Sequence, residues 1–431
     1  MKLYIQSGSA ICYPYNHSEA SFTLGDFALQ MNLQFGHGMM SHTRHLLNEW
    51  GGGGVILSPR DLTNEQLQRV AGEVAGKNTD VLLDPQCYVH GADHARLMTH
   101  DYFRLFSENS TNAFSGGPAT AELLESLAKL ARSMNIRHHI IPGLLARPVS
   151  EDWFAVQETM LSEAPAHFGG DDLYATVALS SDALRNENQV ESVVDRAAHW
   201  NVAGYYLVAE TPDPYLVSDP NWMANLLILA SGLKLTGRTV IVGYCSHQML
   251  CLSVAGIDSI ASGTWINVRA FPPEKFNAPE QDEISRRTIW YYCPQALSEY
   301  KIPFLDIAQR TGMLSEMRPQ ADFASTYSDP LFGGAVPSTV VWGEQNAFRH
   351  YLTCLRSQAL QAHHKSFQEA LDYHRRQLDA AQSRVEIFAE HGILGQYREF
   401  NESIADACRS ALSVLERARG PQLRHQWIGN T

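Results

Sequence analysis

The sequence lacks the features that mark several common protein classes. It has no run of 18 apolar residues, so nothing in it predicts a transmembrane helix. Its first residues carry one lysine and no apolar core of the kind that a secretory signal needs. Its seven cysteines form no CxxC pair and no regular framework. Scattered cysteines without a signal are typical of reduced thiols, which predicts a cytoplasmic protein.

Positive charge is also scarce. The chain has 33 Lys and Arg against 46 Asp and Glu, a net charge of −13, which argues against a broadly basic surface for nucleic acid. A local basic groove stays open, since neutralising a few phosphates needs only a few basic side chains. Solvated, scattered arginines are the simpler interpretation of the candidates, which are Arg60, Arg147, Arg269, Arg286 and Arg287.

Short apolar runs that alternate with helix-like stretches are what the sequence does have. Repeated eight times, this β-then-α alternation predicts an α/β protein with a (β/α)8 barrel, the TIM-barrel fold. The predicted strands are Leu3–Gln6, Val55–Ser58, Asp80–Asp84, Arg137–Pro142, Leu173–Ser180, Gly204–Glu210, Thr239–Tyr244 and Asp258–Ser262.

Helices are predicted between these strands from apolar periodicity. Thr63, with Gln66 three residues on, forms a capping box for one of them. The four glycines of Gly51–Gly54 lack the GxxxxGK[ST] pattern of a phosphate loop and precede a strand, so they predict a helix end and a turn. The predicted helices are Ser41–Trp50, Asn64–Gly76, Ala119–Met134, Glu151–Leu161, Asn188–Trp200, Asn221–Leu235, Gln248–Ala255 and Asp282–Tyr292.

Two regions follow from this pattern. Residues 1–342 are predicted to form the barrel, with long irregular loops at Ser9–Met39 and Gln86–Pro118, where we expect substrate contact and lid motion. Residues 343–431 are predicted to form two or three helices interrupted near Gly392–Gly395. We expect these helices to pack on the outside of the barrel, or to form an interface in a homo-oligomer or a larger complex.

Barrel enzymes work at the carboxyl ends of their strands, which directs attention to two carboxylates. Asp84 ends a buried strand, where burial raises the pKa of a carboxyl group and suits acid–base work. Capping loop amides is the alternative role for Asp84. Glu210 ends another strand, and two carboxylates across a barrel mouth suit chemistry at a glycosidic carbon. The alternative for Glu210 is an ion pair with Arg60.

The other polar residues at strand ends are predicted to bind substrate. A Cys245–His247 nucleophilic pair is conceivable, although side chains that grip substrate are the preferred interpretation of this strand end. Ser262-Gly263-Thr264 offers backbone amides to an anion. The predicted binding residues are Arg60, Gln86, Tyr88, Ser180, Tyr244, Ser246, His247 and Thr264, and Gln6, Ser7, Asp61 and Ser262 occupy equivalent strand ends.

A cluster of potential metal ligands lies in the loop after the third predicted strand. His90 and His94 have the i,i+4 spacing that chelates zinc on a helix. The cluster matches no closed metal motif, and 18 histidines make chance groupings common. We therefore predict no metal and no cofactor. The members of the cluster are His90, Asp93, His94, His100 and Asp101.

Several strand motifs, in this order, resemble the tRNA-guanine transglycosylase superfamily, whose barrel enzymes exchange a guanine base for a modified one. The strand that ends at Asp84 is similar to the one that carries the family's Asp-Ser-Gly-Gly motif, with Pro85-Gln86-Cys87 in place of Ser-Gly-Gly. The other similar segments are Val55–Leu62, Asn201–Ala209, Val240–Ile260 with its Gly-Ile-Asp turn, and Gly343–Asn346. The resemblance implies a glycosyltransferase that modifies nucleic acid.

The sequence departs from the family at most of its functional positions. Ala261 stands where the family has its nucleophilic aspartate, and Cys293 is alone where the family has a zinc motif. Pro142-Gly143-Leu144 and Leu179-Ser180-Ser181 replace its base-recognition residues. Three hypotheses stay open. The first is an enzyme that acts on an N-glycosidic bond of a nucleoside, nucleotide or nucleic acid. The second is a retired barrel that binds nucleic acid or protein within a complex, and the third is a barrel enzyme of unrelated chemistry.

Overall fold

The computed structural model describes residues 29–108, 110–278, 288–362 and 364–429. Eight parallel strands form a nearly closed barrel, hydrogen-bonded in the order β3-β2-β1-β9-β8-β7-β6-β4, with β3 and β4 side by side at the seam. The short β5 (Leu145–Ala146) extends the pairing of β6. The eight strands are β1 (Gln30–Gln34), β2 (Gly53–Leu57), β3 (Thr79–Leu83), β4 (His138–Ile141), β6 (Asp172–Leu179), β7 (Gly204–Ala209), β8 (Thr239–Val242) and β9 (Ser259–Ser262). The TIM-barrel prediction is confirmed.

The first barrel strand is not the predicted one. Gln30–Gln34 pairs with β2 on one side and β9 on the other, a place that the prediction assigned to Leu3–Gln6. The observed strand lies inside the stretch that was predicted to be an irregular loop. Two of its polar residues, Asn32 and Gln34, are buried, and the side-chain amide of Asn32 donates to Ser259 Oγ at 3.0 Å. A search for apolar runs misses such a strand. Leu3–Gln6 and the candidates Gln6 and Ser7 lie outside the described residues.

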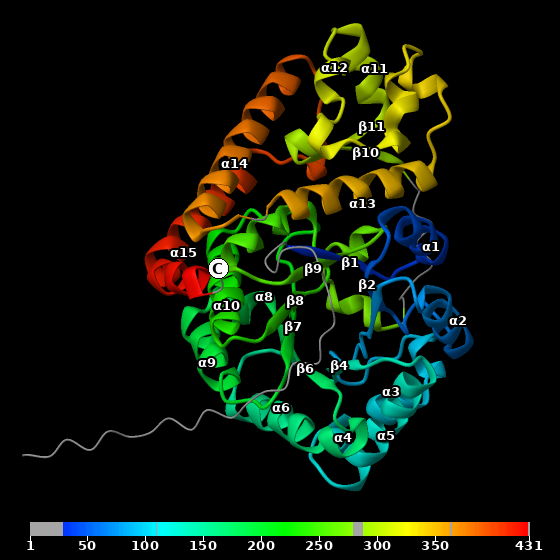
Figure 1. Ribbon diagram of the computed structural model, residues 1–431, viewed down its shortest axis with the longest axis vertical. Coiled ribbons are helices and arrows are strands. Elements are labelled where there is room, and N and C mark those ends of the chain that lie inside the picture. Colours follow the sequence, from blue (N-terminus) through cyan, green and yellow to red (C-terminus); the bar gives the residue numbers. More distant parts are fainter. Residues whose placement is uncertain (1–28, 109, 279–287, 363, 430–431) are drawn as a thin grey trace, which may run out of the picture.

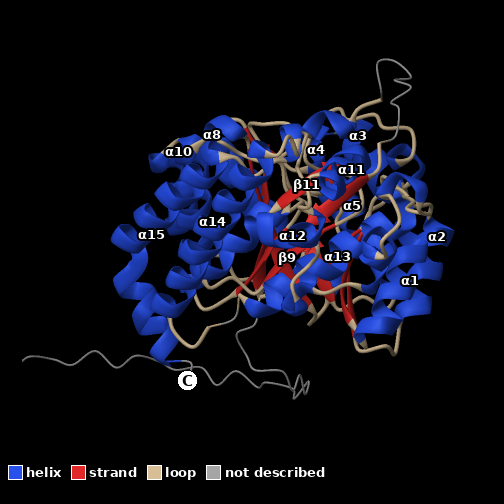
Figure 2. Cartoon of the chain, turned by 90° about the horizontal axis from the view of Figure 1, so that it is seen from above, coloured by secondary structure: helices blue, strands red, loops and turns tan. Residues whose placement is uncertain are grey.

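Helices surround the strands (Figure 2). The capping box of Thr63 and Gln66 is present at the start of α2, and Gly51 ends α1 with a φ of 75°, as predicted. The helices before β9 are α1 (Met39–Trp50), α2 (Asn64–Val74), α3 (Asp101–Glu108), α4 (Ser110–Ala113), α5 (Pro118–Ser133), α6 (Glu151–Glu163), α7 (Pro165–Phe168), α8 (Ser181–Arg185), α9 (Glu187–Ala197) and α10 (Pro220–Leu235), with 3₁₀ turns at η1 (Leu97–Thr99) and η2 (His247–Ala255). None of the helices in the described ranges is long and apolar enough to cross a bilayer.

A small second core follows the barrel. The predicted helix Asp282–Tyr292 is wrong at its end, because β10 (Trp290–Cys293) pairs with β11 (Ser298–Lys301) as an antiparallel hairpin; its first residues lie outside the described ranges. Tyr291 and Tyr300 of the hairpin are fully buried in this core. The region also contains α11 (Ile302–Arg310), α12 (Leu314–Met317) and the 3₁₀ turns η3 (Ile266–Val268), η4 (Pro273–Phe276), η5 (Pro294–Ala296), η6 (Ala321–Phe323), η7 (Thr326–Phe332) and η8 (Pro337–Thr339).

Three long helices complete the chain. They are α13 (Glu344–Gln361), α14 (Phe367–Glu390) and α15 (Glu402–Gly429), with η9 (Gln396–Arg398) in the predicted interruption. Figure 1 shows α13 between the barrel and the β10–β11 hairpin, and α15 alongside α10. Every residue of α10 from Trp222 to Leu233 is buried as a result. The helical region therefore packs on the outside of the barrel.

Candidate functional site at the barrel mouth

Asp84 lies directly after β3 at the mouth, the end of the barrel where the carboxyl ends of the strands meet. Its side chain is fully buried and accepts four hydrogen bonds. Oδ1 accepts from the Tyr88 hydroxyl at 2.7 Å and the Gln86 amide at 3.0 Å. Oδ2 accepts from the hydroxyls of Tyr244 at 2.6 Å and Tyr206 at 3.3 Å. The Asp84 carboxyl group thus accepts hydrogen bonds from β7 and from the segments that follow β3 and β8.

The protonation of Asp84 is set by two opposing effects. Burial raises the pKa of its carboxyl group, because a charge is poorly solvated inside the barrel. Hydrogen bonds from Tyr244 and Tyr88 favour the ionised form and oppose this rise. The effect of burial is the larger one, so the pKa is raised. Asp84 is therefore a better proton donor near neutral pH than an exposed aspartate.

The backbone around Asp84 is strained at two residues. Gln86 has a φ of 59° and Tyr244 a φ of 58°, in the left-handed region that side chains other than glycine rarely adopt. Such a conformation costs about 1–3 kcal/mol and is found preferentially at functional sites. Gly243 precedes Tyr244, and a Cβ there would lie 2.4 Å from the hydroxyl of Tyr206. Close packing around the carboxyl group therefore dictates the backbone on this side of the mouth.

Gln86 joins this buried cluster to a second, polar one. Its side-chain oxygen accepts from the Arg60 amide at 2.9 Å, and its nitrogen donates to Ser58 Oγ at 2.9 Å. Ser58 in turn donates to Asp61 Oδ2 at 2.7 Å, and Arg60 pairs with Asp61 Oδ1 at 3.2 Å. The side chain of Asp61 is 10% exposed. The mouth therefore holds a second carboxylate, which is paired with a cation and partly open to solvent.

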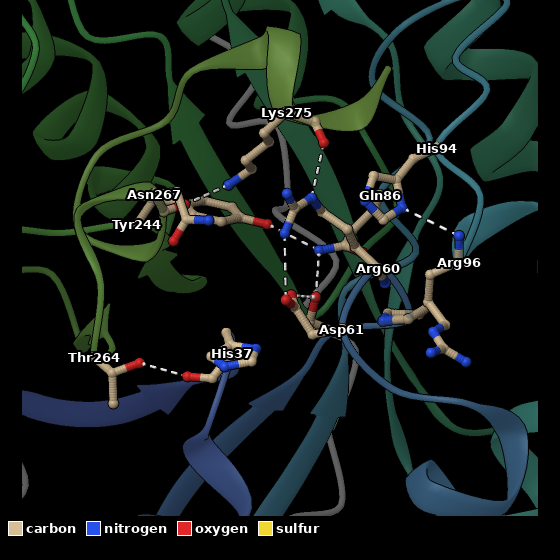
Figure 3. A network of polar contacts seen from close by, with 12 residues as sticks. His37, Arg60, Asp61, Gln86, His94, Arg96, Tyr244, Thr264, Asn267 and Lys275 are labelled. Atoms are coloured by element: carbon tan, nitrogen blue, oxygen red, sulfur yellow. Dashed lines mark hydrogen bonds and ion pairs between the residues drawn. The ribbon is translucent and has the colours of Figure 1, made fainter. Parts of the chain in front are cut away.

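Lys275 lies next to Arg60 at this site (Figure 3). Arg60 Nε donates to the backbone carbonyl of Lys275 at 2.8 Å, and Lys275 Nζ donates to the carbonyl of Asn267 at 2.7 Å. The ammonium group lies 3.6 Å from the centroid of the Tyr244 ring. Sequence reasoning missed Lys275, because it follows the last barrel strand in a Pro-rich segment that carries no motif.

Glu210 is held apart from this cluster. Its Oε1 pairs with Arg147 at 2.9 Å and its Oε2 accepts from the Ser181 amide at 3.0 Å. Within the described part of the chain, it shares no hydrogen-bond partner with Asp84. The alternative pairing with Arg60 is wrong, because Arg147 takes that place.

The other predicted binding residues divide into two groups. Gln86, Tyr88, Tyr244 and Arg60 come together around Asp84 and Asp61, as described above. Of the rest, Ser180 caps α8 through the Ala183 amide and Thr264 donates to the His37 carbonyl at 3.1 Å. Ser246 is buried at the start of η2, as is the strand-end residue Ser262 at the end of β9.

His247 and Cys245 do not form a nucleophilic pair. The Cys245 thiol points to the carbonyls of Val242 and Gly243, and burial raises its pKa to about 12. The His247 ring is fully buried and packs on Tyr292 with 4.9 Å between ring centroids. Burial lowers the pKa of His247 to about 4. Both groups therefore belong to the interior of the protein.

The histidine-rich loop after β3 does not converge on one point. His94 and His90 do not share a helix. Nε2 of His100 is hydrogen-bonded to the carbonyl oxygens of Pro59 and Leu62, at 2.9 and 3.0 Å. No group of three potential metal ligands occurs among the described residues. The remaining members have other partners: the His90 ring stacks near Phe106, Asp93 accepts from the Ala278 amide and Asp101 pairs with Arg104.

A separate buried polar cluster, centred on Glu299, lies beside a cavity between the barrel and the β10–β11 hairpin. Glu299 pairs with Arg269 at 3.3 Å and with Arg398 at 2.8 Å, and accepts from the Tyr215 hydroxyl at 2.7 Å. Burial alone would raise the pKa of Glu299, but the two guanidinium groups outweigh it and lower the pKa to about 2. Arg269 is thus an internal counter-ion. The interpretation of the five arginines as solvated is therefore wrong for Arg269, which is buried. Arg60 and Arg147 are ion-paired, and Arg286 and Arg287 lie outside the described residues.

Comparisons with known proteins add little beyond the fold. No protein-family model and no curated protein matches the chain. The endo-β-1,4-mannanase from Thermotoga petrophila is 10% identical over 62% of this chain and 80% of its own, with a TM-score of 0.38. The carboxyl transferase domain of Rhizobium etli pyruvate carboxylase is 9% identical, with a TM-score of 0.35, over 91% of this chain and 61% of its own. Such distant likenesses carry no argument about function.

Proposed function

We propose that this barrel is an enzyme that acts on an N-glycosidic bond of a nucleoside, nucleotide or nucleic acid. The observation that carries the proposal is the buried carboxyl group of Asp84, which lies at the mouth with two strained residues, Gln86 and Tyr244, and is linked through Gln86 and Ser58 to a second carboxylate, Asp61. Asp84 acts as the acid that protonates the departing base. Asp61 supplies the negative charge that stabilises the positively charged sugar in the transition state.

The proposal assigns the second carboxylate to Asp61 in place of Glu210. Both carboxylates are paired with an arginine, but only Asp61 is linked to Asp84, through Ser58 and Gln86. Arg60, whose side chain is 19% exposed, supplies positive charge for a nucleotide. The resemblance to the tRNA-guanine transglycosylases supports the choice of an N-glycoside, because Asp84 ends the strand that is similar to theirs.

The first test is mass spectrometry of bases released from tRNA, DNA, and a panel of nucleosides and nucleotides. We expect Asp84→Asn and Asp61→Asn each to lower the release at least about 100-fold, the usual contribution of a general acid or of a charge in the transition state. Asp182→Asn, whose side chain is 94% exposed on α8, is the matched control and should leave release unchanged. If Glu210→Gln abolishes release while Asp61→Asn does not, Glu210 is the second carboxylate.

The second candidate is a barrel that binds a partner or nucleic acid without catalysis. It is favoured by the fact that both oxygens of Asp84 already have partners and that the side chain is fully buried. In that case no base is released from any substrate, and Asp84→Asn changes only the stability of the protein. This result would reject the enzymatic proposal.

A further inference from the structure

Lys275 takes no part in the two-carboxylate chemistry, yet its amine lies at the same mouth. It belongs to η4, the turn that returns over the barrel after β9. The rings of Tyr244, Phe276 and Phe271 surround Nζ at 3.6, 5.0 and 5.2 Å. Its hydrogen bond goes to a neutral carbonyl, that of Asn267. Among the described residues, no carboxylate forms an ion pair with it.

This environment disfavours the charged form of the amine. Removal from water lowers the pKa of Lys275 well below its usual value, and the guanidinium of Arg60 lowers it further. The carboxylates of Asp84 and Asp61 oppose this but do not outweigh it. A lysine that is desolvated and placed near another cation is one of the standard ways in which proteins produce a nucleophilic amine.

Lys275 is also connected to the acid of the site. The Tyr244 ring lies under its amine, and the Tyr244 hydroxyl donates to Asp84 at 2.6 Å. A nucleophile and a proton donor therefore lie against one tyrosine, Lys275 over its ring and Asp84 at its hydroxyl.

We propose that Lys275 is a covalent nucleophile that attacks the C1 carbon of a sugar and holds it as an imine. The identity of the sugar rests on the proposed function. Nζ forms a bond to C1 as the bond from C1 to the base breaks, and the base leaves with the proton of Asp84. Nζ then returns one proton to Asp84. The sugar ring opens to the imine when its ring oxygen leaves C1 and takes up the second proton of Nζ. Water hydrolyses the imine, or an incoming base displaces the amine.

The test uses glycolaldehyde, a small carbonyl compound that needs no base as leaving group, with sodium borohydride to reduce the imine to a stable amine. Full-length protein is treated at pH 7 and digested, and the label on each lysine peptide is measured. We expect Lys275 to carry at least about tenfold more label than Lys301, whose amine also lies over an aromatic ring, 5.1 Å from Trp290. Equal or lower labelling of Lys275 would overturn the inference.

Two variants and a second arm separate the possible failures. Lys275→Arg should remove the selective label, whereas Lys301→Arg should leave it unchanged. In the second arm, borohydride is added during base release, and we expect the sugar on Lys275. If bases are released and no sugar is trapped, Lys275 is not the nucleophile although the proposed function stands. If glycolaldehyde labels Lys275 selectively while no base is released from any substrate, the imine chemistry stands and the N-glycoside is the wrong substrate.

Discussion

Two buried carboxyl groups in this protein have opposite properties because their partners differ. Asp84 is surrounded by neutral hydroxyls, so burial raises its pKa. Glu299 lies between two guanidinium groups, so its pKa falls. The signs of their effects on stability follow. A raised pKa in the folded state makes Asp84 stabilising only at low pH, and this contribution is lost as the pH rises through the folded-state pKa. Glu299 stabilises the fold at neutral pH.

The contribution of Glu299 should disappear in acid. Between its ordinary pKa of 4.5 and its folded-state pKa of about 2, the linkage amounts to about 3 kcal/mol. We expect Glu299→Gln to lower the free energy of unfolding at pH 7 by about 3–5 kcal/mol, since Arg269 and Arg398 lose their buried counter-ion. The difference from the unmodified protein should shrink as the pH falls from 5 towards 2, which urea unfolding at several pH values measures.

Glu316→Gln is the matched control for this experiment. Glu316 pairs with Arg384 at 3.5 Å, but its side chain is 57% exposed, and exposed pairs contribute about 0–1 kcal/mol. A loss of stability in Glu299→Gln that stays constant from pH 7 to pH 3 would contradict the assigned ionisation.

At the scale of single elements, the surroundings of a helix decide the effect of its glycines. Gly232 in α10 faces α9, and a Cβ there would lie 2.6 Å from a methyl group of Val194. Gly72 in α2 is exposed, and a Cβ there would meet nothing within 4 Å. The intrinsic helix propensity is the same at both positions, so the two sites separate propensity from packing.

We expect the two substitutions to alanine to have opposite signs. Gly72→Ala should stabilise the protein by about 0.5–1 kcal/mol, the intrinsic advantage of alanine in a helix. Gly232→Ala should destabilise it by about 1–3 kcal/mol, because overpacking forces α9 and α10 apart. Thermal and urea unfolding measure both. A stabilising Gly232→Ala would mean that the two helices have room to separate.

At the scale of the whole molecule, the barrel and the terminal helices depend on one another. The helix α10 is apolar around its whole circumference, which is typical of a helix covered on all sides. The barrel covers one side and α15 covers another (Figure 1). Without α15, a large apolar surface of the barrel would be exposed to water.

A charge on the buried face of α15 should therefore destabilise the entire protein. Leu415 is fully buried, whereas Ala418 lies on the exposed face of the same helix. We expect Leu415→Asp to lower the free energy of unfolding by more than about 3 kcal/mol and to increase binding of an apolar dye, because the carboxylate is buried without a partner. Ala418→Asp should change stability by less than about 0.5 kcal/mol. Similar effects of both substitutions would show that α15 is not needed to cover the barrel.

The sequence alone determined the local parts of the structure. Apolar periodicity identified seven barrel strands, the α/β class and the longer helices between them, because strands buried on both faces and amphipathic helices carry their own patterns. It missed α3 and α4, which lie in the stretch predicted to be an irregular loop. The Thr63 capping box and the turn at Gly51 followed from short-range chemistry. The position of Asp84 at the mouth followed from its place at the end of an apolar strand.

Tertiary structure decided everything that depends on distant residues. The strand Gln30–Gln34 has polar residues, and only pairing with β2 and β9 makes it part of the barrel. The sequence favoured Glu210 as the second carboxylate, and only the fold shows that Glu210 pairs with Arg147 whereas Asp61 is linked to the Asp84 cluster through Ser58 and Gln86. Lys275 is 191 residues from Asp84 in the chain, and the two share Tyr244 only after the barrel has formed. The burial of these side chains and the charged groups around them result from packing. Their chemistry therefore cannot be predicted from any local stretch of the sequence.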